Sequence, residues 1–139
     1  MKPITREMVR LYRIKNFDFM GYDIKIKESL SFHHLIVPHR ECKKLHIPND
    51  GYVMWNGAIL VQNTSHEYLH IIEHTDYDMF SALTSEMIDM NINGHLDIEN
   101  LRYIKDILLL FEREHDHDKN KRGKLLIKRE YTQNRFNWE

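Results

Sequence analysis

The feature that most constrains the fold is a change of periodicity at about residue 63. Residues 57–62 form a short apolar run, Gly-Ala-Ile-Leu-Val-Gln, which is typical of a buried strand. The residues that follow, Thr64-Ser65-His66-Glu67, fit the capping-box pattern, in which two side chains bond the exposed N–H groups of a helix start. We therefore predict a strand over 57–62 and a helix from about Ser65 to His74.

Further strands are predicted upstream of this point. Residues 30–37 are apolar apart from one serine and two histidines, and Pro38 ends the segment because proline cannot donate to a ladder. Residues 22–27 alternate apolar and charged side chains, as a half-buried strand does. Residues 52–55 are predicted as a strand segment next to Asn56-Gly57, a pair that permits a tight reversal or bulge. Residues 2–15 fit either a short helix or a strand.

Two helices are predicted in the C-terminal half. Residues 75–90 place large apolar side chains at spacings of three and four, and Asn93-Gly94 breaks the chain. Residues 97–114 place a longer apolar stripe on one face: Ile98, Leu101, Ile104, Leu108 and Phe111. We expect these helices to pack as a hairpin on the strands, which gives an α+β fold with no internal repeat.

Composition sets the class of protein. A chain of 139 residues with 42% hydrophobic residues fits one domain with a substantial core. The single cysteine, Cys42, excludes a disulfide framework and a Cys-rich zinc knuckle. No apolar stretch approaches the roughly 20 residues that a membrane span needs, and the charged residues 1–13 lack the apolar region of a signal peptide. The expected location is therefore cytoplasmic, with no membrane partner.

The formal net charge of −1 hides a strong asymmetry. Residues 1–48 carry ten Lys/Arg against five Asp/Glu, residues 49–118 carry three against fourteen, and residues 119–139 carry seven against two. One interpretation is a solvated surface with uneven charge. The other is that the basic segments 2–44 and 119–135 share one face and bind phosphates, because local rather than net charge neutralises them. The candidate phosphate-binding residues are Arg40, Lys43, Lys44, Lys121, Arg122 and Lys124.

Histidines supply the strongest chemical signal. The neighbours His33-His34 mean little alone, since roughly 0.7 such pairs are expected by chance among ten histidines. His66 and His70, however, lie one helical turn apart and can share a metal ion. His33 is the obvious third ligand. Because successive strand side chains point to opposite faces, His34 would then lie close to the metal without binding it, free to accept a proton from water.

At these residues the chain resembles the His-Asn-His (HNH) endonucleases, most closely the His-His…Asn…His-x-x-x-His variant of colicin-type nuclease domains. The resemblance covers residues 32–74, roughly a third of the chain: His33-His34 followed by Pro38, then Asn56 before an apolar strand, then His66-x-x-x-His70 opening a helix. It implies a ββα-metal core over residues 31–74. A basic segment (1–30) would precede this core, and a helical extension (75–115) and a basic tail (116–139) would follow it within one domain, 1–139.

The resemblance also implies roles. His34 would be the general base. Asn56 would brace the loop and orient this base. His33, His66 and His70 would hold one divalent ion, with Zn, Ni, Co, Mn and Mg all open. The substrate and partner would be DNA, bound through its phosphates. Asn63 is a second candidate for the central asparagine.

Two other functions compete with the nuclease. His66-Glu67-x-x-His70 also fits the HExxH helix of zinc proteases, in which Glu67 would be the base; Glu86 could be a third ligand. The capping box already accounts for Glu67, and the Gly of the extended motif is missing. The third possibility is a non-catalytic DNA- or protein-binding module, either a degenerate HNH fold or a chain that simply contains many histidines. We expect residues 115–118, His-Asp-His-Asp, to be a solvated cluster.

Overall fold

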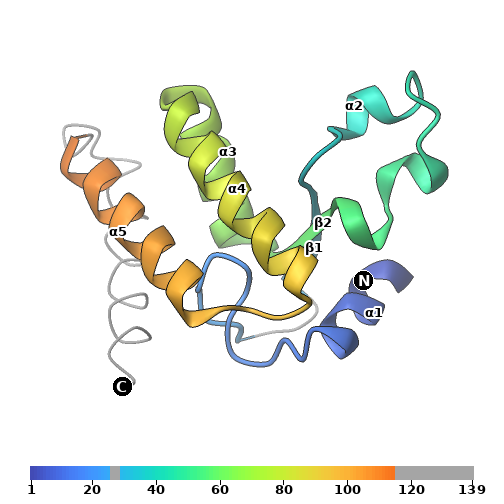
Figure 1. The fold of residues 1–139 in the computed structure, drawn as a ribbon, viewed down its shortest axis with the longest axis horizontal. Coiled ribbons are helices and arrows are strands. Elements are labelled where there is room, and N and C mark those ends of the chain that lie inside the picture. The colour runs from blue at the N-terminus through green and yellow to red at the C-terminus, as the bar shows by residue number, and fades with distance from the viewer. Residues whose placement is uncertain (26–28, 115–139) are drawn as a thin grey trace.

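The computed structural model describes residues 1–25 and 29–114 (Figure 1). Helices and a small sheet alternate along the chain, so the predicted α+β class is confirmed at that level. The elements are α1 (Pro3–Leu11), β1 (Leu30–His34), α2 (His39–Cys42), β2 (Gly57–Val61), α3 (Glu67–Thr75), α4 (Tyr77–Asn93) and α5 (Ile98–Glu114). Short 3₁₀ turns lie at Pro48–Gly51 and Met54–Asn56, and a π turn lies at Gln62–His66. Within the described residues, no helix has both the length and the apolar character needed to cross a membrane.

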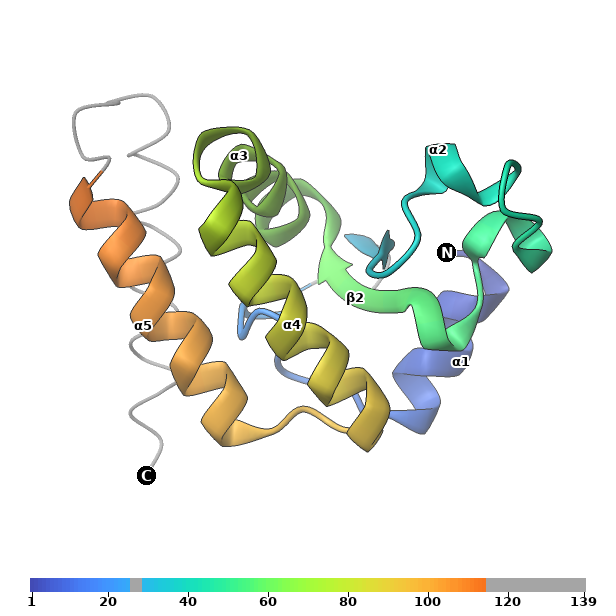
Figure 2. The same cartoon turned by 45° about the horizontal axis from the view of Figure 1, so that its top comes forward.

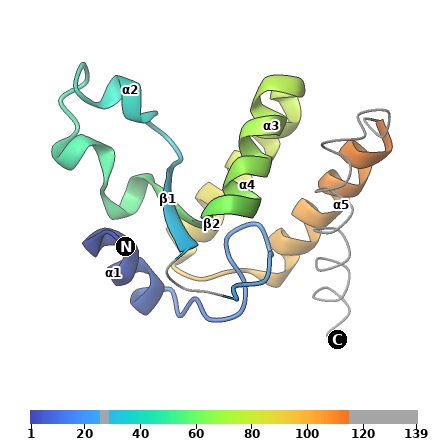
Figure 3. The same cartoon turned by 180° about the vertical axis from the view of Figure 1, so that it is seen from behind.

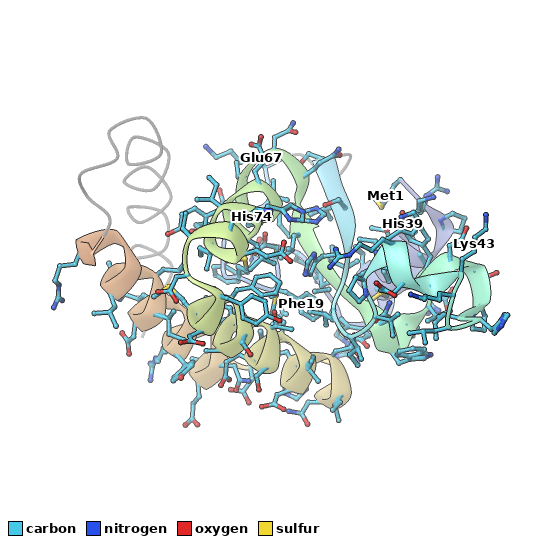
Figure 4. All side chains as sticks on the ribbon, turned by 90° about the horizontal axis from the view of Figure 1, so that it is seen from above. Met1, Phe19, His39, Lys43, Glu67 and His74 are labelled. Atoms are coloured by element: carbon cyan, nitrogen blue, oxygen red, sulfur yellow. The ribbon has the colours of Figure 1, made fainter. Side chains whose placement is uncertain are left out.

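The two strands pair antiparallel at the centre of the molecule. Leu30 lies opposite Val61 and His34 lies opposite Gly57, and every residue of β2 is buried. The loop after α1 covers the second edge of β2, where the N–H of Phe19 donates to the carbonyl of Ile59 at 3.1 Å. Figure 3 shows this loop beside the strands, and Figure 4 places Phe19 in the middle of the molecule. The sheet is therefore short but enclosed.

Helix α4 holds the helical half of the protein on the sheet. Its buried side chains follow the predicted three- and four-residue spacing: Met79, Leu83, Met87 and Met90. It packs against β2 and α3, and α5 lies along its other side (Figure 2). Gly94 ends the helix with a φ of +75°, a conformation that glycine adopts without strain. The predicted break at Asn93-Gly94 and the predicted helix at 97–114 are confirmed.

A buried amide joins α4 to both the sheet and α1. The Asn91 side chain donates to the carbonyls of Met54 and Gly57. Its Oδ1 accepts from the Tyr12 hydroxyl at 3.1 Å. The start of β2 is thus fixed from a position more than thirty residues further along the chain.

Three strand predictions differ from the structure. Residues 52–55 form no strand. The chain enters the 3₁₀ turn at Met54–Asn56, and the Asn91 side chain donates a hydrogen bond to the Met54 carbonyl. No tight reversal occurs at Asn56-Gly57, where Gly57 is extended with a φ of −123°. Strand β1 stops at His34 rather than at residue 37, because the backbone N–H groups of residues 35–37 donate to Asn56 instead of to a neighbouring strand. Of residues 22–25, only Asp23 forms a bridge, with Phe17; residues 26 and 27 of the predicted strand lie outside the described part.

The predicted capping box is also wrong. No side chain caps α3, which begins after the π turn. The Ser65 hydroxyl instead donates to the carboxylate of Asp18, and its oxygen accepts from the Val61 N–H. Asp18 is fully buried and also accepts from the N–H groups of Met20, Tyr22 and Val61. Burial raises the pKa of this carboxyl, while these hydrogen bonds lower it. The turn that leads into His66 is therefore held from the N-terminal loop.

Candidate metal centre and catalytic cleft

A cleft of about 590 Å³ separates α4 and the end of α3 from the loop that follows β1. Histidines 33, 34, 66 and 70 line it, together with Arg40, Tyr52, Glu73 and side chains from the first half of α4. In Figure 4, His74 of α3 lies across the molecule from His39, the first residue of α2. The four histidines singled out by the sequence pattern thus share one cavity.

Three of these imidazoles form a cluster. The ring centroids of His33 and His66 are 5.1 Å apart, those of His66 and His70 are 4.9 Å apart, and those of His33 and His70 are 6.1 Å apart. His33 Nδ1 and His66 Nε2 are separated by 3.3 Å. Two nitrogens bound tetrahedrally to one zinc ion at ~2.0–2.1 Å would lie roughly 3.4 Å apart. This pair is therefore spaced as two ligands of one ion would be.

The hydrogen bonds around His66 fix its tautomer. The Ser31 hydroxyl donates to the carbonyl of Leu60 at 3.1 Å, so its oxygen is available to accept from His66 Nδ1–H at 2.8 Å. His66 Nε2 then carries a lone pair, and this is the atom that faces His33. An imidazole whose outer N–H is bonded in this way is oriented as metal-ligating histidines usually are.

His70 has a similar support. Its Nδ1 lies 3.3 Å from Oε1 of Glu73, three residues further along α3. When a carboxylate accepts from Nδ1–H, the lone pair of Nε2 is free to bind a metal ion, and the ring becomes a stronger metal ligand. The His70 side chain is about half exposed, so of the three imidazoles it has the most room to move.

His33 is the buried member of the cluster. It is 6% exposed, and its Nε2 has no hydrogen-bond partner within the described residues. Burial first, then the neighbouring histidines, lowers the pKa of His33 to about 3, and burial lowers the pKa of His66 to about 4. Both rings are therefore neutral at pH 7, the state in which imidazole binds a metal.

The donor chemistry of the cluster fits a divalent transition metal: it has three imidazoles, two with outer N–H partners and one with a buried nitrogen that has no partner among the described residues. No group of three or more His, Cys, Asp or Glu side chains within residues 1–25 and 29–114 is already arranged as a complete metal-ligand set. The His33–His66 pair has ligand spacing, whereas the His70 ring stands further from His33.

His34 points away from this cluster, as the alternation of a strand predicts. It packs beside Tyr52 and His39, with ring centroids at 4.7 and 5.1 Å. Its Nε2 lies 3.0 Å from the carbonyl of Asp50, which can only accept, so Nε2 carries the proton and Nδ1 the lone pair. Burial lowers the pKa of His34, while the hydrogen bond to Asp50 raises it. A neutral imidazole with a fixed tautomer is equipped to act as a general base.

The turn at Pro48–Gly51 positions the Asp50 carbonyl next to His34. Asn49, Asp50 and Gly51 have φ values of 55°, 56° and 82°, and Asn, Asp and Gly are the residues that best tolerate this left-handed region. A Cβ on Gly51 would lie 2.4 Å from Sγ of Cys42 and 2.8 Å from Cδ2 of His34. Because Gly51 has no side chain, the His34 ring can lie against the turn.

Asn56 braces the same loop. It is fully buried and makes four side-chain hydrogen bonds. Its Oδ1 accepts from the N–H groups of Ile36 and Val37, and its Nδ2 donates to the carbonyls of Val37 and Gly51, all at 2.8–3.1 Å. Asn63, the other candidate, is exposed on the π turn. Of the two candidate asparagines, Asn56 is the one that is buried and braces this loop.

The candidate phosphate-binding residues divide into two groups. Arg40 lines the cleft, whereas Lys43 and Lys44 are exposed just after α2 and do not line it. Lys121, Arg122, Lys124 and the cluster at residues 115–118 lie outside the described residues.

The protease geometry is not favoured. Glu67 is exposed on α3, at the outer edge of the molecule in Figure 4, and does not line the cleft. Glu86 does not line it either. A metalloprotease base has to lie beside the metal and its water.

Sequence reasoning missed three supporting residues: Ser31, Glu73 and Asp18. Two had a local signal. Ser31 shares a strand face with His33, two residues on, and Glu73 is three residues from His70 on a helix. Asp18 had none, because the partners that connect it to the turn before His66 are Val61 and Ser65, 43 and 47 residues away.

No family model, curated protein or solved structure matches this chain. Its function is therefore inferred from the residues of the cleft.

Proposed function

We propose that this protein is a metal-dependent endonuclease that hydrolyses phosphodiester bonds in DNA, with a ββα-metal core at residues 31–74 like that of the HNH enzymes it resembles. One observation carries the proposal. His33 and His34, adjacent on β1, face opposite sides of one cleft, the first joining a three-imidazole cluster and the second held by a carbonyl as a neutral base.

In this reaction His34 Nδ1 accepts a proton from water as the water oxygen bonds to phosphorus. The bond from phosphorus to the 3′-oxygen breaks, and solvent protonates the departing oxygen. The Asp50 carbonyl, bonded to Nε2–H, stabilises the imidazolium that forms. Arg40 pairs with the phosphate from the same cleft.

His33, His66 and His70 would hold the metal ion, with Ser31 and Glu73 orienting the second and third rings. A bound divalent ion supplies Lewis-acid stabilisation of charge on the phosphate and the departing oxygen. Three imidazoles suit several first-row metals, so the residues do not select one ion.

The test combines cleavage and metal binding. Purified full-length protein is incubated with supercoiled plasmid and Mg²⁺, Mn²⁺, Co²⁺, Ni²⁺ or Zn²⁺ in turn, with a chelator as control. We expect nicked or linear product with at least one metal and none with chelator. If no metal supports cleavage, the nuclease proposal is wrong, and the non-catalytic binding module is the remaining possibility.

The ligand set is tested separately by titrating metal into variants. His66→Ala and His70→Ala should each weaken metal binding sharply. His74→Ala is the matched control, because His74 continues the same four-residue series on α3 but does not line the cleft. An equal loss in all three variants, or no loss in the first two, would remove these residues as ligands.

A further inference from the structure

The two walls of the cleft differ in charge. Arg40 is the one Lys or Arg among the described residues that line it, and the exposed Lys43 and Lys44 follow it in the sequence. The opposite wall is formed by α4 and the end of α3, and among the described residues it contributes Glu73 and no Lys or Arg to the cleft. The chain has no Lys or Arg at all between Lys44 and Arg102. Apart from the proposed metal ion, the described side chains of only one wall can neutralise phosphates.

The α4 wall instead offers aromatic rings. Tyr77, the first residue of α4, is 67% exposed and lines the cleft. Phe80 lies beside it, with ring centroids 5.8 Å apart and an interplanar angle of 34°. Further along the same wall, the buried hydroxyl of Thr84 has no hydrogen-bond partner among the described residues. An exposed tyrosine next to a candidate catalytic cleft is suited to contact a flat, apolar group.

These walls suit a single strand better than a duplex. A duplex carries phosphates on both strands, so a duplex that fills the cleft also brings phosphates toward the second wall, where Glu73 repels them. A single strand carries phosphates along one side and exposed bases along the other. Proteins that bind single strands combine a positive track for the backbone with aromatic rings on which the bases stack.

We propose that the cleft binds unpaired DNA, with a phosphate against Arg40 and a base stacked on Tyr77 and Phe80. This inference rests on the proposed nuclease function and specifies its substrate. Duplex DNA is then cut where its strands separate, at bubbles, flaps or ends.

The test measures binding in the His34→Ala background, so that cleavage does not consume the probe. Fluorescence anisotropy follows three labelled probes of one sequence: a single strand of roughly 16 nucleotides, its duplex, and the duplex with a central unpaired bubble. We expect tighter binding of the single strand and the bubble than of the duplex. Tyr77→Ala and Phe80→Ala should each weaken single-strand binding about 5- to 150-fold, the range for loss of one base stack.

Two control variants isolate the ring. Tyr77→Phe keeps the aromatic face and should retain binding. Tyr103→Ala removes a 48%-exposed tyrosine of α5 that does not line the cleft, and should have no effect. Circular dichroism checks that each variant is folded.

The outcomes separate this inference from the nuclease proposal. If the wild-type protein cuts DNA but the duplex binds as tightly as the single strand, or if Tyr77→Ala and Phe80→Ala bind normally, the inference is overturned and the nuclease stands. If no DNA is cut with any metal while single-strand binding depends on Tyr77, the nuclease proposal fails and the binding surface stands.

Discussion

Replacing Asn56 by alanine removes the four hydrogen bonds that hold the loop around the candidate base. The bonds go to backbone groups of Ile36, Val37 and Gly51. Gly51 follows Asp50, whose carbonyl holds His34. The substitution therefore affects both the stability of the loop and the orientation of the base.

The magnitude follows from the environment of each bond. A buried group that loses its partner costs about 1–3 kcal/mol. The bond to the Gly51 carbonyl is buried, whereas the three to residues 36 and 37 are partly buried, so water can replace much of what is lost there. We expect a total loss of about 2–4 kcal/mol in the free energy of unfolding, against about 5–15 kcal/mol for a typical domain. The variant should still fold.

Thermal and urea unfolding followed by circular dichroism measure this loss, and roughly 3–4 °C per kcal/mol converts it to a fall of about 6–16 °C in Tm. The cleavage rate should fall by part of the roughly 10²–10⁴-fold that a general base contributes. Metal affinity should change little, because the Asn56 side chain does not contact the histidine cluster.

Asn63→Ala is the matched control. Asn63 is exposed, so its replacement should change the free energy of unfolding by less than about 0.5 kcal/mol. The reasoning would be refuted if Asn56→Ala were as stable and as active as Asn63→Ala.

Three further predictions follow from single residues. Gly51→Ala should lower the free energy of unfolding by about 2–4 kcal/mol, from backbone strain and the clash of its Cβ; Gly94→Ala, with a similar φ and open space, should cost about 1–2 kcal/mol, and equal melting curves would contradict this. Glu67→Gln should retain DNA cleavage, because Glu67 does not line the cleft, and a loss of cleavage would contradict the assignment of His34 as the base that acts without Glu67. Ser31→Ala and Glu73→Gln should each weaken metal binding about 10- to 100-fold in calorimetric titrations, and unchanged affinity would argue against these residues as supports.

Local signals predicted much of the fold. The apolar run at 57–61, the glycine at 94 and the stripe in α5 each depend on neighbours in sequence, and each corresponds to an observed element. The opposite orientations of His33 and His34 follow from the pleat of a strand alone. These features need no knowledge of the rest of the chain.

The errors arise where distant residues decide the backbone. The segment before Asn56 has the composition of a strand, but Asn91 binds the Met54 carbonyl from α4. Thr64 and Glu67 fit a capping box, but the chain forms a π turn there, and the neighbouring Ser65 donates its hydroxyl to the buried carboxylate of Asp18. Neither partner is visible in a local pattern, because hydrogen bonds over such separations exist only after the helices have packed.

The candidate site was predictable to a similar extent. The helical spacing of His66 and His70 and the alternation of strand side chains predicted that His33 would lie with these two histidines and that His34 would point away from them. These patterns did not show that the Asp50 carbonyl fixes the tautomer of His34, since that contact depends on three consecutive left-handed residues in the turn.

The most direct test of the account measures His34→Ala for metal affinity and for DNA cleavage in the same preparation. The account predicts that the variant binds the activating metal as tightly as the wild-type protein, because His34 faces away from the cluster, and that it no longer cleaves DNA. A His34→Ala protein that still cleaves at the wild-type rate, or that loses its metal, would contradict the division of the pair into a ligand and a base.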